Sequence, residues 1–197
     1  MRAFLALDFD AAALAILRAY VRDLRHLTWS KHIKWVGDDS LHSTTRFLGE
    51  IDGAQKDILI ESLRAPSALD KPEALTITVM SPQLFPKSTR PRLVVCLIKP
   101  HPVLTALALA CETAAQTIGV PAERRAFLGH VTLGRVRDSW PRRGEAGPEA
   151  GPEAGQASPL IAPSQAYPTR ANALTLYQSL LKSSGAEYVP LHRWPFG

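Results

Sequence analysis

The sequence predicts an α+β fold with antiparallel sheets, and three observations support this prediction. Helical patterns are few, and the predicted strands often follow one another without a helix between them. Such successions are typical of antiparallel pairing, because parallel neighbours need a long crossover connection. Each half of the chain also holds a helix and one strand with a His-x-Thr motif, which indicates an internal pseudo-duplication. The 197 residues suit one domain, or two small lobes that share a core.

The first half of the chain predicts three strands and two helices. Residues 2–8 are apolar and alternating, as in a half-buried strand. Residues 11–27 carry apolar side chains three and four positions apart, which predicts an amphipathic helix with Asp10 as its N-cap. Two further strands and a second helix are predicted at residues 33–36, 41–48 and 53–65.

The second half repeats this alternation of strands with a helix. Residues 74–80 alternate and contain β-branched side chains, and residues 92–98 are almost continuously apolar, so both predict strands. Residues 102–118 predict another amphipathic helix, opened by Pro102 at a position where proline is tolerated. The last strands are predicted at residues 127–136, 173–181 and 187–191.

Residues 139–168 interrupt this order with Pro, Gly, Ala, Ser and Glu, and with a Glu-Ala-Gly-Pro tetrad that occurs twice. Such a composition buries too little apolar surface to offset the entropy cost of ordering the chain. We expect a mobile, low-complexity loop here. A tolerated insertion explains it more simply than a lid or an RNA tether does.

Composition limits the function less than the motifs do. The formal net charge of +5 favours polyanionic partners, but the Arg, Ala, Pro and Gly codons of a GC-rich genome explain it equally well. Cys96 and Cys111 form no CxxC pattern and lie in apolar runs, so we expect buried thiols. Asp8 and Asp10 interrupt the first apolar run too early for a signal peptide, and no apolar run is long enough to span a membrane. We therefore expect a monomeric cytoplasmic protein.

Two strands carry the same short motif, with a threonine two residues after a histidine. The pairs are His42 with Thr44, and His130 with Thr132. On a strand, residues two apart project to the same side at a separation of about 6.5 Å. Two such strands facing each other would place two imidazoles and two hydroxyls around one centre.

That centre suits hydrolysis of a phosphodiester without a metal or other cofactor. One neutral histidine can remove a proton from water while a protonated one donates a proton to the leaving oxygen, because the imidazole pKa lies near the working pH. The hydroxyls can bind the non-bridging phosphate oxygens. We prefer His42 as the acid and His130 as the base, and leave the reverse assignment open.

A single His-x-Thr pair has little specificity. A third pair, His26 and Thr28, lies at the end of the predicted first helix, where residues two apart do not share a side, so we exclude it. On a strand the ordinary interpretation of one pair is a hydrogen-bonded structural pair. Two copies on predicted strands in separate halves favour the chemical interpretation.

The longer context resembles the RNA 2',3'-cyclic phosphodiesterases, also called 2'-5' RNA ligases or LigT-like proteins, of the 2H phosphoesterase superfamily. The resemblance rests on His-x-Thr-x-x-Phe-Leu-Gly from His42, a Phe-Pro turn at Phe85, and His-x-Thr-Leu-x-Arg from His130. It extends over nearly the whole chain apart from residues 139–168. Two departures concern the packing around the motifs: Ser43 and Thr45 stand where the family usually has aliphatic residues, and Gly129 stands where it often has proline.

The resemblance implies a bilobed fold over residues 1–197, with pseudo-two-fold antiparallel sheets, flanking helices and a central cleft. It also implies hydrolysis of RNA 2',3'-cyclic phosphate to a 2'-phosphate, with reversible 2'-5' ligation in some members. His42 and His130 become the acid–base pair, and Thr44, Thr132 and Arg135 become phosphate-binding residues. RNA ends, such as those of tRNA fragments, and cyclic-phosphate nucleotides all fit as substrates.

Three other side chains near the motifs need placing. Strict alternation puts Arg135 on the opposite side of its strand from His130, so it reaches phosphate only if the strand bends or ends there. Alternation puts Arg46 on the His42 side, as a ligand or as a solvated charge, and puts Phe47 on the core side. Arginines crowd the second motif and suit RNA backbone contacts or a solvated basic surface. They are Arg124, Arg125, Arg135, Arg137, Arg142 and Arg143.

Two alternative functions compete with the phosphodiesterase. A catalytically idle RNA-binding module would keep the fold, although binding alone needs no matched pair of imidazoles. A metallohydrolase would use His42 and His130 as ligands, although the motifs lack nearby Asp, Glu or Cys. Activity that resists chelators would exclude the metallohydrolase.

Overall fold

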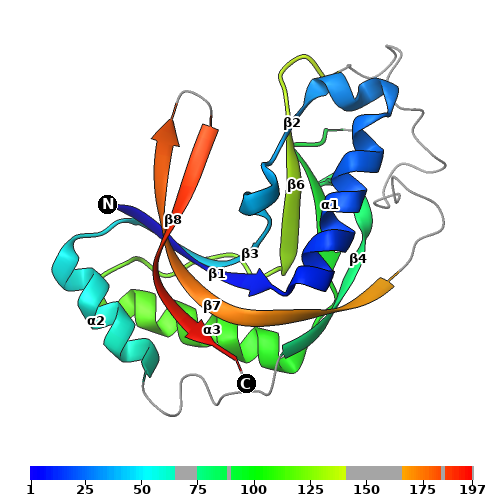
Figure 1. Cartoon of the computed structure of the whole chain (residues 1–197). Coiled ribbons are helices and arrows are strands. Elements are labelled where there is room, and N and C mark those ends of the chain that lie inside the picture. The colour runs from blue at the N-terminus through cyan, green and yellow to red at the C-terminus, as the bar shows by residue number, and fades with distance from the viewer. Residues whose placement is uncertain (65–74, 88–89, 141–165, 183–184, 197) are drawn as a thin grey trace.

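The protein is described by a computed structural model that covers residues 1–64, 75–87, 90–140, 166–182 and 185–196. In these ranges the chain forms eight strands, three α-helices and two short 3₁₀ helices (Figure 1). The elements are β1 Arg2–Phe9, α1 Ala11–Arg25, η1 Thr28–His32, β2 Ile33–Trp35, η2 Asp38–Ser40, β3 Ser43–Glu50, α2 Gly53–Arg64, β4 Leu75–Phe85, β5 Leu93–Ile98, α3 Pro102–Thr117, β6 His130–Val136, β7 Ala166–Lys182 and β8 Gly185–Pro195.

All strand pairs are antiparallel, and they form one sheet in the order β2-β6-β5-β4-β7-β1-β3, with β8 also paired to β7. The 17-residue strand β7 lies in the interior of this sheet, between β4 and β1, and belongs to both of its halves. Its first residues pair with β4, and the rest pair with β1 and β8. We call β1, β3, β8 and residues 171–182 the His42 lobe, and β2, β4, β5 and β6 the His130 lobe. Figure 1 shows the curved β7 running between them.

The helices are exchanged between the lobes. Helix α1 follows β1 of the His42 lobe, yet its Tyr20 packs against Tyr167, in the part of β7 that pairs with β4. Helix α3 follows β5 of the His130 lobe, yet it contacts β3 and packs on α2. Each lobe is therefore covered by a helix that the chain builds directly after a strand of the other lobe.

Local sequence explains where the helices begin and what they bury. The Asp10 carboxylate accepts a hydrogen bond of 2.8 Å from the Ala13 backbone N–H, which caps α1 as predicted. Leu17, Val21 and Leu24 form the buried stripe of α1 at helical spacing. These side chains belong to one apolar cluster with buried residues of the other helices and of the sheet.

The predicted order of strands and helices is confirmed, with differences at the boundaries. Strand β7 begins at Ala166, so residues 166–168 belong to the sheet and not to the predicted loop. Residues 141–165 of that loop lie outside the described residues. Cys96 and Cys111 are free, buried thiols, as expected. None of the helices in the described part of the chain has the length and apolar character that crossing a membrane requires.

Candidate active site

The two His-x-Thr pairs come together where β3 meets β6. His42 directly precedes β3 and Thr44 lies within it, whereas His130 and Thr132 both lie in β6. The two strands are in contact, and the charge of His130 lowers the pKa of His42, so the imidazoles interact. All four side chains are half-buried. The structure thus brings together the four residues that the motifs singled out.

A β-bulge lies at the same place in both motifs. Thr44 and Arg46 pair with consecutive residues of β1, so Thr45 is an extra residue in β3. Thr132 and Gly134 likewise pair with consecutive residues of β5, and the extra residue is Leu133. The exposure pattern over the six residues from each histidine is the same: half-buried, buried, half-buried, buried, buried, exposed. The two motifs are therefore repeated in backbone geometry as well as in sequence.

The bulge in β3 reverses the expected positions of Arg46 and Phe47. Phe47 is 61% exposed, and its ring lies 5.9 Å from that of Phe4, which lies 5.1 Å from His42. Phe47 is thus on the His42 side, and the prediction that it belongs to the core is wrong. Arg46 is 9% exposed and forms an ion pair with Glu112 of α3, on the other side of β3. Arg46 is therefore neither a ligand beside His42 nor a solvated charge, and both expectations are wrong.

The bulge in β6 has the opposite consequence for Arg135, because it brings this side chain to the His130 side. Arg135 takes the same position in its motif as Phe47 does in the first, and it is exposed. The odd spacing from His130 does not place it on the far side, because the extra residue Leu133 shifts the alternation by one. An aromatic ring and a guanidinium group therefore occupy equivalent places at the two motifs.

Aromatic rings surround His42. The Tyr177 ring is stacked at a centroid distance of 6.2 Å and the Tyr188 ring meets it edge-on at 5.2 Å, while Phe4 completes the group. Burial among these rings lowers the pKa of His42 to about 4, since desolvation disfavours the charged form. A hydrogen bond with the Ser40 backbone opposes the shift, and repulsion from His130 adds to it. His42 is thus neutral at pH 7 in the free protein.

His130 is held by its backbone. Its Nδ1 lies 2.8 Å from the Leu128 carbonyl oxygen, which can only accept, so Nδ1 carries the proton in this contact. The other nitrogen, Nε2, is left to act on a ligand. The ring also lies parallel to that of Phe85, at a centroid distance of 6.2 Å. Hydrogen bonding and stacking together fix the orientation of this imidazole.

The threonine hydroxyls are available for a ligand. Within the described ranges, neither the Thr44 nor the Thr132 hydroxyl has a hydrogen-bond partner. Behind them, the residues that depart from the family pattern pack into the lobe: Ser43 is fully buried, and Thr45 lies against the Cys111 thiol of α3. The Ser43 hydroxyl is buried without a partner in the described part of the chain.

A carboxylate that the sequence did not single out anchors this aromatic group. Asp8 of β1 accepts hydrogen bonds from the Tyr177 hydroxyl at 2.7 Å and from the Thr175 hydroxyl at 2.6 Å. Arg193 of β8 lies 3.8 Å from the same carboxylate. Tyr177 thus connects Asp8 to His42, whose ring it contacts. Pairing of Asp8 with residues more than 160 positions away leaves no local signal in the sequence.

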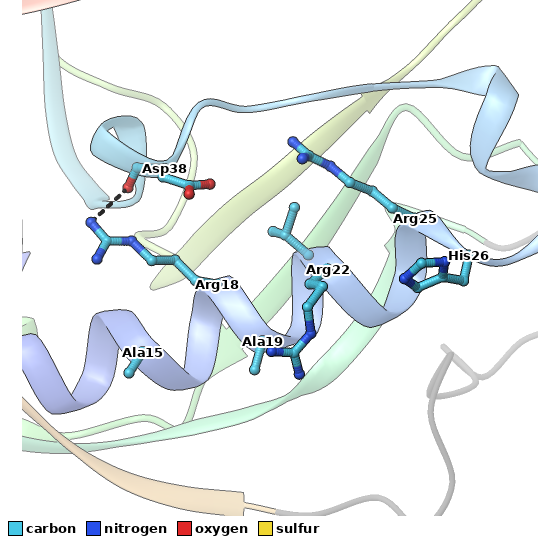
Figure 2. A pocket seen from close by; sticks show the side chains of 8 residues that line it. Ala15, Arg18, Ala19, Arg22, Arg25, His26 and Asp38 are labelled. Atoms are coloured by element: carbon cyan, nitrogen blue, oxygen red, sulfur yellow. Dashed lines mark hydrogen bonds between the residues drawn. The ribbon is translucent and has the colours of Figure 1, made fainter.

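The other arginines of the expected basic cluster are exposed or undescribed. Arg124, Arg125 and Arg137 are exposed, whereas Arg142 and Arg143 lie outside the described residues. A separate hollow of about 490 Å³ lies beside α1, where Arg18, Arg22, Arg25 and His26 line it together with Asp38 of η2 (Figure 2). Arg18 donates a hydrogen bond to the Asp38 carbonyl there. None of the predicted site residues lines this hollow.

Comparisons with known proteins identify the fold. No family model matches the chain. The RNA 2',3'-cyclic phosphodiesterase of Geobacillus stearothermophilus is 26% identical over 128 residues, and the chain spans about two fifths of that relative's length. TT0787 of Thermus thermophilus superposes over 100% of this chain and 98% of its own, with a TM-score of 0.73 and 20% identity. The apo form of E. coli LigT superposes over 99% and 96%, with a TM-score of 0.66 and 23% identity. The chain thus has the fold of E. coli LigT and TT0787.

Proposed function

We propose that this protein hydrolyses the 2',3'-cyclic phosphate at an RNA end to a 2'-phosphate. The observation that carries the proposal is the meeting of two half-buried imidazoles on contacting strands with the same bulge. A relative named RNA 2',3'-cyclic phosphodiesterase and a structure of E. coli LigT complexed with 3'-AMP support a nucleotide substrate.

In the proposed reaction, a water molecule attacks phosphorus and the bond from phosphorus to the ribose 3' oxygen breaks. One imidazole takes the proton of the water, and the other gives a proton to the leaving oxygen, so no net proton is consumed. The product keeps its phosphate on the 2' oxygen. The same two groups in the same roles, with an RNA 5' hydroxyl attacking phosphorus in place of water and the 3' oxygen leaving, would form the 2'-5' linkage.

Three side chains would hold the phosphate. The hydroxyls of Thr44 and Thr132 each lie beside a histidine and lack partners in the described part of the chain. The bulge in β6 adds the guanidinium of Arg135 on the His130 side, where it can offset the charge that builds up on the phosphate oxygens. The exposed ring of Phe47 takes the equivalent place on the other strand and can stack on a nucleobase.

The lowered pKa of His42 bears on which histidine is the base. A neutral imidazole accepts a proton, so the free protein favours His42 as the base, the reverse of the preference stated from the sequence. His42 can act as the acid only if the bound phosphate raises its pKa by about three units, or about 4 kcal/mol. An anion about 4 Å away supplies about that much at an effective dielectric constant near 20. Both assignments are therefore physically accessible, and an altered substrate distinguishes them.

The first experiment tests the reaction itself. Purified protein, with EDTA present, is incubated with a short RNA that ends in a 2',3'-cyclic phosphate, and the product is typed as 2'- or 3'-phosphate. We expect a 2'-phosphate, formed by the wild type and lost in both His42→Ala and His130→Ala. RNA binding without turnover would favour the idle binding module, and activity abolished by EDTA would favour the metallohydrolase.

A second experiment assigns the acid and the base. The bridging 3' oxygen of the cyclic phosphate is replaced by sulfur, which leaves as a thiolate and needs no proton from the enzyme. Loss of the acid should matter little with this substrate, whereas loss of the base should remain severe. If His130→Ala regains activity and His42→Ala does not, His42 is the base. The opposite result makes His42 the acid and requires that the phosphate raise its pKa.

A further inference from the structure

A second cation lies directly opposite Arg135. Strand β2 pairs with β6 in the register that places Lys34 against Arg135, so the two side chains project to the same side, the side of His130. Both are exposed. Strand β2 is the edge strand of the sheet, so Lys34 lies at its rim.

This pairing is unfavourable for the protein alone. Like charges directly opposite on antiparallel strands repel and destabilise the pair. Within the described residues, neither Lys34 nor Arg135 has an acidic partner. Asp39, in the acidic segment that follows β2, forms an ion pair with Arg18 at 3.7 Å. An anion between the two cations would remove the repulsion.

The position of Lys34 separates it from the reacting phosphate. Arg135 lies three residues beyond Thr132, which is at most about 10 Å along the strand. Lys34 lies one strand further out, about 4.8 Å away in the sheet. Lys34 is therefore further from the threonine hydroxyls than Arg135 is, at a place that a phosphate next to the reacting one could reach.

We propose that Lys34 binds a second phosphate, the phosphodiester on the 5' side of the nucleotide that carries the cyclic phosphate, while Arg135 opposite it holds the reacting phosphate. The proposal rests on the function proposed above and narrows its substrate class. A ligand with two phosphates uses both positions, whereas a cyclic mononucleotide uses only the inner one. The site then prefers RNA chains to cyclic mononucleotides.

The test compares two substrates that differ in the outer phosphate. One is a nucleoside 2',3'-cyclic phosphate with a free 5' hydroxyl, and the other is a dinucleotide that ends in the same cyclic phosphate. We expect Lys34→Gln to lower the ratio of kcat/KM for the dinucleotide to that for the mononucleotide about tenfold. Lys34→Arg should largely preserve the ratio, because it keeps the charge. Lys56→Gln, on helix α2, is the matched control.

Salt dependence provides a second measurement. The logarithm of the binding constant for the dinucleotide should fall linearly with the logarithm of the salt concentration. Removing one phosphate contact should make the slope of this line shallower by about 0.7. The proposal is overturned if Lys34→Gln leaves both the ratio and the salt slope at the wild-type values. It is also overturned if the variant loses the same factor on both substrates, since Lys34 would then act on the reacting phosphate. If the wild type turns over neither substrate, the proposed function itself fails.

Discussion

Protonation of His42 should destabilise the fold in mildly acidic solution. Its pKa is about 4 in the folded protein and 6.5 when unperturbed. Above pH 6.5 the group is neutral in both states and contributes nothing to the pH dependence. As the pH falls below 6.5, the unfolded chain binds a proton that the folded protein resists until about pH 4, so stability falls with pH over this window. At about pH 5 the cost is about 2 kcal/mol.

The measurement compares the change in the free energy of unfolding with pH between two proteins. Urea unfolding of the wild type and of His42→Gln, which cannot take up the proton, is followed at about pH 7.5 and about pH 5. The other titrating groups contribute to both proteins, so the wild type should lose about 2 kcal/mol more than the variant between the two conditions. The imidazole signal of His42 in NMR should also titrate with a midpoint near 4. Equal losses in both proteins would refute the argument that burial among aromatic rings disfavours the charge.

Three substitutions test the packing around the motifs by urea unfolding. Ser43→Ala should raise the free energy of unfolding by about 1 kcal/mol, because it removes a buried hydroxyl that has no partner in the described ranges; a decrease would show that this hydroxyl is satisfied. Gly134→Ala should cost about 1–3 kcal/mol, because a Cβ there would lie 2.5 Å from a β2 side chain. Gly53→Ala, which meets no atom within 4 Å, is its control, and equal effects would contradict the steric argument. Arg46→Met should lower the free energy of unfolding by about 3 kcal/mol, because it leaves Glu112 without its cation. Adding Glu112→Gln to this variant should recover part of the loss. If the effects of the two substitutions simply add, the ion pair does not stabilise the fold.

The sequence predicted the elements and the motif pairs well because these depend on local periodicity. The apolar spacing of α1 and the capping carboxylate of Asp10 are visible within a few residues. The two His-x-Thr pairs are equally local, and alternation alone places each threonine beside its histidine. The two motifs come together because strands that are distant in the sequence lie side by side. Only the family resemblance indicated this arrangement.

Three failures of sequence reasoning share one physical cause. Alternation assumes a regular ladder, and an extra residue in β3 or β6 exchanges the two sides for the residues directly after it. Phe47, Arg46 and Arg135 all lie beyond such a bulge, and strict alternation misplaced each of them. The length of β7 was also missed, because the residues that begin it, Ala166–Pro168, carry no strand pattern and are ordered by pairing with β4.

The exchange of α1 and α3 makes the two halves of the chain mutually dependent. A fragment cut after α2 would keep His42 but lose α3, which covers β3. It would also carry α1 without β7, whose Tyr167 packs against Tyr20 of α1. Neither half is therefore a module that can be excised, transplanted or replaced on its own. The spacing of the two imidazoles then depends on the whole hydrophobic core, since a rotation of one lobe against the other would break the packing of α1 or α3 on the opposite lobe.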